Sequence, residues 1–301
     1  MGGAGFVGRH LVAALAARGA RVTVPTRRRE RAKHLILLPT VDVVEVERLD
    51  ARVLAQLAAG RDAVVNLAGI LHGPDFRLAH VELAQSAVNA CHRAGVGRLL
   101  HMSALGADPA APSEYLRSKG SGERAVLAAD DIAVTVFRPS IIFGPEDRFL
   151  NLFARLAAWL PLFVLGSPGA CFQPVYVGDV VRAFLAALDS DDSAGKSYDL
   201  CGPRQYTLRQ LIELVCAITG RRRLVIGLPD GLSYLQAWSM ELLPVKLLTR
   251  DNYYSMRVPN VSGSVFPFGI QPVVLEATAP SWLAPAGPRE RYPQLRWKAK
   301  R

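Results

Sequence analysis

The sequence predicts an α/β fold in which a doubly wound parallel sheet carries helices on both faces, followed by a smaller C-terminal α/β lobe. Short β-branched runs alternate with helical patterns through the first half of the chain, and this alternation is typical of βαβ units. Half of the 301 residues are hydrophobic and 21% are charged, which is the composition of a globular protein and not of a disordered one.

The predicted elements follow one another regularly up to residue 137. A helix over residues 10–18 ends at Gly19, a residue type that is common directly after a helix. The later elements are, in chain order, a strand over 21–24, a strand over 41–46, a helix over 51–59, a strand over 63–67, a helix over 81–94, a strand over 98–102, a helix over 115–129 and a strand over 132–137.

Prolines and glycines interrupt this rhythm after Arg138. We therefore expect one domain over residues 1–145 and a smaller lobe over residues 146–301. Residues 175–200 are expected to return to the sheet, with a helix over 180–188 packed against it. The tail from Pro280 onward is rich in proline and basic residues, which favours an irregular end.

The chain opens with a glycine-rich loop, Gly2-Gly3-Ala4-Gly5-Phe6-Val7-Gly8, directly before the first helix. Gly2, Gly5 and Gly8 have GxxGxxG spacing. Glycines there let backbone N–H groups approach a pyrophosphate, whose negative charge is favoured at a helix N-terminus. A tight turn without a ligand is the alternative. The position between strand and helix patterns favours a Rossmann-type dinucleotide site formed by Gly2, Gly5, Phe6, Val7 and Gly8.

The first charged residue after the strand over 21–24 is Arg27, which stands 19 positions after Gly8. Enzymes that use NAD usually place an acidic residue there for the ribose hydroxyls, whereas arginine suits the 2′-phosphate of NADP. The sequence therefore favours NADP(H) over NAD(H), with a solvated basic helix start as the alternative.

Tyr115 and Lys119 lie four residues apart and share one face of a predicted helix. An ammonium beside a phenol favours the phenolate, so we expect the pKa of Tyr115 to fall below about 10. Such a phenol can exchange a proton with a carbonyl or alcohol while a hydride moves at a nicotinamide. An accidental Tyr/Lys pair on an exposed helix is the alternative.

These motifs, with Asn66-Leu67-Ala68-Gly69 and Arg138-Pro139-Ser140, resemble those of extended, atypical short-chain dehydrogenases/reductases, which are NAD-dependent epimerase/dehydratase-like. The strings RRRERAKHLILLPTVDVVEV, RPSIIFGPEDRFLNLFARL and FQPVYVGDVV resemble a narrower group. That group is the bacterial relatives of alpha-subcomplex subunit nine of respiratory NADH:ubiquinone oxidoreductase. The resemblance runs from Gly2 to about Tyr206, and it implies further cofactor contacts at Leu67, Ala68, Gly69, Pro139 and Ile141. It also implies an acidic adenine contact at Glu47, after the strand over 41–46, and a catalytic hydroxyl at Ser103, after the strand over 98–102.

The sequence departs from that pattern at two places. Ala104 and Leu105 follow Ser103 where a second hydroxyl often occurs, and His80 stands where many active relatives carry asparagine. We expect His80 to be structural. The cofactor site is therefore better supported than the catalytic machinery.

Three functions remain open. The first is an accessory or assembly factor linked to respiratory NADH:quinone oxidoreductase or to ubiquinone metabolism, with NADPH as a structural ligand. The second is an NADP-dependent reductase of a small carbonyl substrate, which would use Tyr115 and Lys119. The third is a nucleotide-sugar epimerase or dehydratase, the default for this fold. The incomplete catalytic set favours the first.

Composition and charge narrow the partners. A formal net charge of +10 favours anionic partners, but the basic residues are not interleaved with aromatics, so we expect no nucleic acid. Cys91, Cys171, Cys201 and Cys216 have no CxxC or metal-ligand spacing, which predicts no metal site and buried free thiols in a reducing, cytoplasmic compartment.

Two segments suggest a respiratory or quinone-biosynthesis complex, or an anionic membrane surface, as a further partner. Residues 149–165 are apolar apart from Arg155 and Pro161, and they are too short to span a bilayer. Six basic residues crowd the tail: Arg289, Arg291, Arg296, Lys298, Lys300 and Arg301. These segments allow two interpretations. One is peripheral attachment at the inner face of the cytoplasmic membrane, and the other is a buried helix followed by a solvated tail.

A glycine loop of this type joins the first strand of the sheet to the first helix. Because the loop opens at Gly2, that strand is lacking before it except for Met1 itself. We therefore expect a gap between the strands over 21–24 and 63–67, and a functional protein that carries several residues before Met1. A real truncation that folds with the gap or borrows a strand is the alternative.

Overall fold

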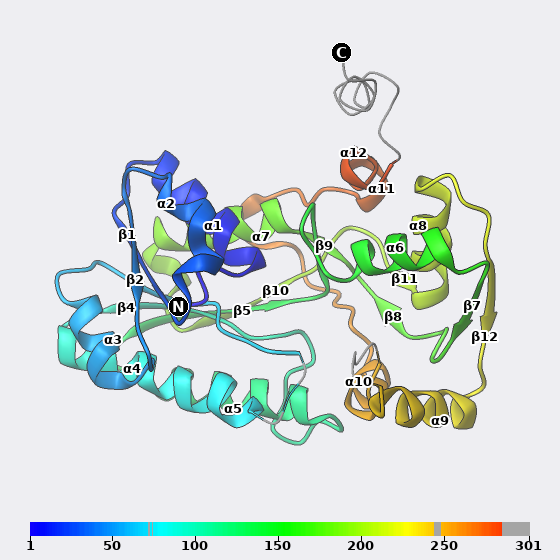
Figure 1. The fold of residues 1–301 in the computed structure, drawn as a ribbon. Helices are drawn as coiled ribbons and strands as arrows, with labels where there is room; N and C mark the ends of the chain where they lie inside the picture. The colour runs from blue at the N-terminus through cyan, green and yellow to red at the C-terminus, as the bar shows by residue number, and fades with distance from the viewer. Residues whose placement is uncertain (72, 74, 244–247, 285–301) are drawn as a thin grey trace, which may run out of the picture.

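The fold is described from a computed structural model, which covers residues 1–71, 73, 75–243 and 248–284 (Figure 1). A parallel sheet of four strands has the order β10-β5-β4-β3. These strands are β3 (Val64–Asn66), β4 (Arg98–Met102), β5 (Ala133–Pro139) and β10 (Lys196–Leu200). Leu100 and Phe137, at the centre of the sheet, are fully buried, as expected for parallel strands that are covered on both faces.

Strands β1 (Val22–Thr26) and β2 (Val41–Glu45) form a separate parallel pair. Among the described residues no strand lies between β1 and β3, which confirms the predicted gap. Met1 alone pairs with β3 there: its amino group donates to the Val65 carbonyl (2.5 Å), and its carbonyl accepts from the Leu67 N–H (3.1 Å).

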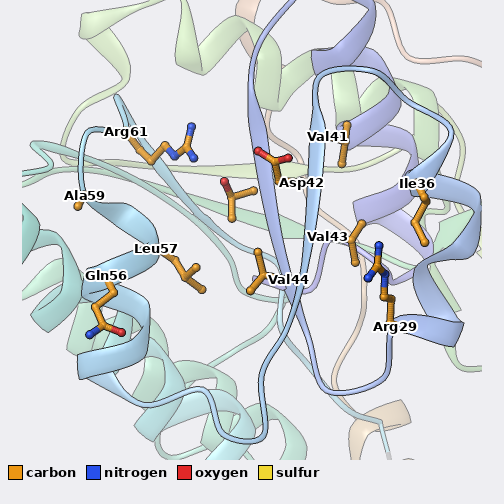
Figure 2. A pocket seen from close by; sticks show the side chains of 11 residues that line it. Arg29, Ile36, Val41, Asp42, Val43, Val44, Gln56, Leu57, Ala59 and Arg61 are labelled. Atoms are coloured by element: carbon orange, nitrogen blue, oxygen red, sulfur yellow. The ribbon is translucent and has the colours of Figure 1, made fainter.

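A hollow of about 460 Å³ lies beside β2, as Figure 2 shows. It is lined by Thr23, by residues of β2 and by Gln56, Leu57 and Arg61, and by none of the glycine-loop residues. Two buried atoms in its wall, Thr23 Oγ1 and Arg61 Nε, have no hydrogen-bond partner. The hollow is therefore separate from the glycine loop and from the candidate cofactor site.

Helices cover both faces of the sheet (Figure 1). Helices α1 (Phe6–Ala17) and α7 (Val177–Leu188) pack together on one face. Helices α3 (Ala51–Ala58), α4 (Leu83–Ala94) and α5 (Glu114–Leu127) pack side by side on the other. The short helix α2 (Lys33–Ile36) lies beside β1 and β2. This arrangement is the predicted Rossmann-type doubly wound fold.

Side-chain caps and a glycine fix the ends of helices α3, α4 and α5. The Asp50 carboxylate accepts from the Arg52 and Val53 amides and begins α3, and the Ser113 hydroxyl accepts from the Leu116 amide and begins α5. Helix α4 ends at Gly95, whose φ of 69° is the left-handed conformation that glycine adopts at little cost. A π-helical turn over Leu78–Glu82 leads into α4 and brings His80 into the core.

The smaller lobe contains short strands and six helices among its described residues. Its strand pairs are β6 (Ile142–Phe143) with β9 (Val175–Tyr176), β7 (Leu162–Leu165) with β12 (Leu224–Gly227), and β8 (Cys171–Phe172) with β11 (Tyr206–Thr207). Its helices are α6 (Leu150–Trp159), α8 (Leu208–Ile218), α9 (Asp230–Glu241), α10 (Arg250–Met256), α11 (Leu275–Thr278) and α12 (Pro280–Leu283). A second core, which includes Phe143, Leu150, Phe163, Ile212 and Val215, holds them together.

The apolar stretch over 149–165 is not one helix. It forms α6, a turn at Leu160 and Pro161, and strand β7. Leu150 and Ala157 of α6 are buried in the lobe's core. Within the described ranges, no helix has the length and hydropathy needed to cross a bilayer.

Candidate dinucleotide-binding site

The glycine loop packs so closely that side chains are excluded. A Cβ atom on Gly8 would overlap the Gly2 carbonyl oxygen and lie 2.6 Å from Gly3 Cα. Gly2 has a φ of 75°, and a Cβ there would lie 2.8 Å from the Leu67 carbonyl carbon. The Gly5 amide closes the turn by donating to the Gly2 carbonyl (3.0 Å). Glycine is thus required at Gly2 by conformation and at both positions by space.

Helix α1 begins at this loop without a side-chain cap. Gly5 is its N-cap residue, and no side chain accepts from the first amides of the helix. Uncapped N–H groups at a helix N-terminus favour an anionic ligand. Phe6 and Val7, the predicted contacts, stand at this point, and Phe6 lies within 3.1 Å of the position that a Cβ of Gly144 would take.

The carboxyl ends of the parallel strands bring the other predicted residues to the same edge as the loop. Arg27 directly follows β1 and Glu47 follows β2, and both side chains are exposed. Leu67 and Ala68 follow β3. Pro139 ends β5, and the Ile141 carbonyl accepts from the Val175 amide (2.9 Å). Ligands of open α/β sheets bind at this edge.

Lys119 connects two of these strand ends. Its Nζ donates to the Met102 carbonyl (3.0 Å) and the Ala68 carbonyl (3.4 Å). A Cβ on Gly69 would lie 3.1 Å from the same Nζ. The side chain is 4% exposed, and burial lowers the pKa of Lys119 to about 8, against a smaller raising effect of Glu123. The structure therefore brings Lys119 to the Leu67–Ala68–Gly69 segment and to the strand end before Ser103.

The Tyr115 ring packs edge-on against two other rings, those of His80 (5.6 Å between centroids) and Phe76 (6.2 Å). Burial raises the pKa of Tyr115 to about 12. The expected lowering was wrong, because desolvation of the phenolate is the dominant effect and the Lys119 ammonium donates to backbone carbonyls.

Two buried polar atoms near Lys119 lack partners. The Ser103 hydroxyl, in a side chain that is 2% exposed, and His101 Nε2 make no hydrogen bond within the described structure. Such atoms are rare in folded proteins unless a ligand or water satisfies them. The glycine cradle, the uncapped helix and the unpaired Ser103 hydroxyl fit a polar, anionic cofactor at this edge.

His80 is a fully bonded core residue, as the sequence analysis expected. Its Nε2 accepts from the Ile70 amide (3.1 Å), so the ring proton is on Nδ1, which donates to Ser118 Oγ (2.8 Å). Ser118 in turn donates to the Tyr115 carbonyl (2.9 Å). Burial, and then the charge of Lys119, lowers the pKa of His80 to about 3, so the ring is neutral.

Sequence reasoning missed Asp251 of α10. Its carboxylate accepts from the backbone amides of Glu114 (2.6 Å) and Tyr115 (3.2 Å), so it caps α5 from the smaller lobe. No sequence signal relates Asp251 to Tyr115, because 136 positions separate them.

All four cysteines are free; Cys91, Cys201 and Cys216 are buried, whereas Cys171 is exposed, so its predicted burial was wrong. Within the part of the chain that the structure describes, no three His, Cys, Asp or Glu side chains are grouped so as to hold a metal ion.

Comparison with known proteins identifies relatives over most of the chain. Mouse NADH dehydrogenase (ubiquinone) 1 alpha subcomplex subunit 9, mitochondrial, is 32% identical over 298 residues, which cover 91% of this chain and 76% of the relative. The Arabidopsis thaliana protein of the same name is 38% identical over 226 residues, and the match spans only 56% of its length. A Caulobacter vibrioides ceramide reductase is 33% identical over 249 residues, covering 79% of this chain and 77% of that protein.

Solved structures with low sequence identity share the fold. A nucleoside-diphosphate-sugar epimerase from Staphylococcus aureus superposes with a TM-score of 0.72 at 17% identity, covering 91% of this chain and 96% of that one. A Streptomyces venezuelae dTDP-glucose 4,6-dehydratase with NAD bound gives 0.65 at 24% identity, covering 78% and 88%. Residues 1–201, which hold the glycine loop and the main sheet, match the NAD dependent epimerase/dehydratase family. The chain therefore belongs to that family, and the resemblance to relatives of alpha-subcomplex subunit nine is confirmed.

Proposed function

We propose that this protein binds NADP(H) and acts as an accessory or assembly component of respiratory NADH:quinone oxidoreductase or of ubiquinone metabolism. The observation that carries the cofactor proposal is the glycine cradle at the uncapped start of α1, with Arg27 at the end of the neighbouring strand β1. A guanidinium at that strand end matches the geometry of a 2′-phosphate. The respiratory role is supported by the named relatives of mouse and Arabidopsis.

The neighbourhood of Tyr115 supports a mainly structural role for the cofactor. Lys119 donates to two backbone carbonyls, and burial raises the pKa of the Tyr115 phenol to about 12. His80 fills the position where the resemblance implies asparagine, and its two ring nitrogens are both occupied by hydrogen bonds. In this arrangement the chain holds a phenol that is protonated at neutral pH.

A reductase is the second candidate, and a specific observation favours it. Lys119 reaches the strand end beside Ser103, whose buried hydroxyl is unpaired. A bound nicotinamide would supply the hydride, and Tyr115 would donate its phenolic proton to a carbonyl oxygen. The Caulobacter vibrioides relative supports an apolar, lipid-like substrate for such a reaction. A nucleotide-sugar activity has only the shared fold in its support.

We also propose a cytoplasmic protein that attaches peripherally to an anionic membrane surface. The formal net charge of +10 favours that surface. The six basic residues of the tail lie outside the described residues, so this part of the proposal rests on the sequence alone.

Mass spectrometry of the natively purified protein tests the two candidates together. The accessory role predicts co-purified NADPH that is not consumed when carbonyl lipids are added, and membrane-complex subunits in the same preparation. The reductase predicts oxidation of the bound NADPH that is lost in Tyr115→Phe, while Tyr254→Phe on α10 retains it. Absence of any bound dinucleotide, with no affinity for added NADPH, would refute both.

A further inference from the structure

The helix α9 exposes its apolar side. Gln236 Nε2 donates to the Val164 carbonyl (2.8 Å), and Ser233 Oγ accepts from the Ser167 amide (3.0 Å), so these polar residues face strand β7. On the other side, Leu232, Leu235, Trp238 and Leu242 are 50%, 54%, 46% and 73% exposed. Their spacing of three and four residues places them on one face. A surface helix of a globular protein has the opposite orientation.

The adjoining two-stranded sheet of β7 and β12 also exposes apolar side chains on its outer face. Phe163, Leu165 and Val225 point into the core of the smaller lobe. The alternate residues Leu162, Val164, Leu224 and Ile226 point outward and are exposed. Trp159, directly before β7, is 88% exposed. We call Trp159 and the outward residues of β7, β12 and α9 the apolar face. In Figure 1 these elements lie together at the far end of the smaller lobe.

This concentration is specific to one part of the molecule. Eighteen large hydrophobic residues are exposed in the described structure, and 12 of them lie between Trp159 and Leu243. Contiguous exposed apolar surface of this kind marks an interaction site.

The charges around the apolar face are basic. Arg155 is exposed on α6, one turn before Trp159, and Arg221 and Arg222 stand just before β12, separated from it by Arg223. Neither 150–165 nor 221–227 contains an acidic residue. The two acids of α9 are already engaged: Asp230 accepts from the Tyr253 hydroxyl (2.8 Å), and Glu241 pairs with Arg250 (2.6 Å). The positive charge at the border is therefore not compensated by these neighbours.

We propose that the apolar face inserts into the interfacial layer of an anionic phospholipid bilayer. Leucine and tryptophan side chains with arginines at their border are the composition that binds this layer, since the apolar groups enter it and the guanidinium groups meet lipid phosphates. A second copy of this chain would present the same arginines and repel them. The inference deepens the peripheral attachment of the proposed function, because it assigns that attachment to folded residues and not to the tail.

Sedimentation with vesicles tests the assignment. The full chain is mixed with vesicles of phosphatidylcholine alone and of phosphatidylcholine with phosphatidylglycerol, at low and high salt. We expect salt-sensitive binding to the anionic vesicles, and a loss of at least about tenfold in the Leu235→Ser/Trp238→Ser double variant. Arg222→Gln should weaken binding to the anionic vesicles only. The matched control, Leu37→Ser/Val265→Ser, changes two exposed apolar residues elsewhere and should bind as the wild type does.

The outcomes separate this inference from the cofactor proposal. Each variant retains the tail, and its NADPH affinity and circular dichroism are measured on the same sample. Normal NADPH affinity with unchanged vesicle binding in the α9 variant would overturn the apolar face as the membrane site. A wild-type dimer that the α9 variant dissociates, without vesicle binding, would assign the face to a second copy instead. Vesicle binding without NADPH affinity would refute the cofactor proposal alone.

Discussion

The Lys119 ammonium donates a hydrogen bond to the Met102 carbonyl, 3.0 Å away, and so joins helix α5 to the end of strand β4. Its burial lowers the pKa of Lys119 to about 8, from 10.5 in a solvated lysine. Between these pH values the unfolded chain binds more protons than the folded one, so the free energy of unfolding rises with pH. The full effect is about 3 kcal/mol at most.

Urea unfolding at pH 8 and pH 10 measures this contribution. We expect the wild type to gain stability relative to Lys119→Met over that interval. The buried thiols of Cys91, Cys201 and Cys216, whose pKa values burial raises, lower stability with pH equally in both proteins and cancel in the difference. Lys196→Met, at an exposed position of β10, is the control. The interval stops at pH 10 because burial raises the pKa of Tyr115 to about 12, which lowers stability above pH 10. An unchanged pH dependence in Lys119→Met would contradict the burial of its charge.

Two buried histidines predict acid sensitivity. Burial is the main cause that lowers the pKa of His80 and of His101 to about 3. As the pH falls from 6.5 to 3, the unfolded chain takes up these protons first, so the folded state is destabilised. We expect His80→Asn and His101→Asn each to reduce this loss by more than about 1 kcal/mol, measured by urea unfolding at pH 6.5 and 4.5. Acid sensitivity equal to that of the wild type in both variants would show that the two rings are not buried as neutral groups.

Gly8→Ala should lower both stability and dinucleotide affinity. The added Cβ would overlap the Gly2 carbonyl oxygen, so the glycine loop must move away from α1. We expect a loss of at least about tenfold in NADPH affinity, as for other displacements of a phosphate-binding loop. Gly97→Ala is the matched control, because a Cβ there meets no atom within 4 Å. Calorimetric titration with NADPH measures the affinity of both variants. If Gly8→Ala binds NADPH as tightly as Gly97→Ala does, the pyrophosphate does not bind at the glycine loop.

Asp251→Ala tests the cap that the smaller lobe supplies to α5. The carboxylate accepts from the Glu114 and Tyr115 amides, and removal of such a cap costs about 1 kcal/mol. Thermal unfolding should show this loss, whereas the exposed Asp62→Ala should leave stability within about 0.5 kcal/mol of the wild type. If Asp251→Ala is as stable as Asp62→Ala, the contact between α10 and α5 contributes nothing.

The sheet and its helices could be predicted because their signals are local. The strand over 98–102 coincides with β4, and the strands over 21–24 and 41–46 differ from β1 and β2 by at most two residues at an end. The smaller lobe could not be predicted in the same way, since β6, β8 and β9 have only two residues each and show no periodicity.

The residues of the candidate site also fall into two groups, those that a local sequence pattern predicts and those that depend on packing between distant segments. The glycine loop was predicted because conformation and close packing both demand glycine within seven consecutive residues. The direction of the Tyr115 pKa shift could not be predicted in this way. The Tyr115 ring is covered by Phe76 and His80, which lie in or next to a π-helical segment some 35 residues earlier in the chain. Asp251 and the apolar face arise from packing between distant segments, which no local pattern encodes.

Titration with NADPH and with NADH measures whether Arg27 selects the 2′-phosphate of NADP(H). It compares the wild type with Arg27→Asp and with Arg21→Asp, which makes the same charge change at an exposed residue before the opposite end of β1. We expect the wild type to bind NADPH at least about tenfold more tightly than NADH, Arg27→Asp to lose this preference, and Arg21→Asp to keep it. Equal affinities in the wild type, or an unchanged preference in Arg27→Asp, would contradict it.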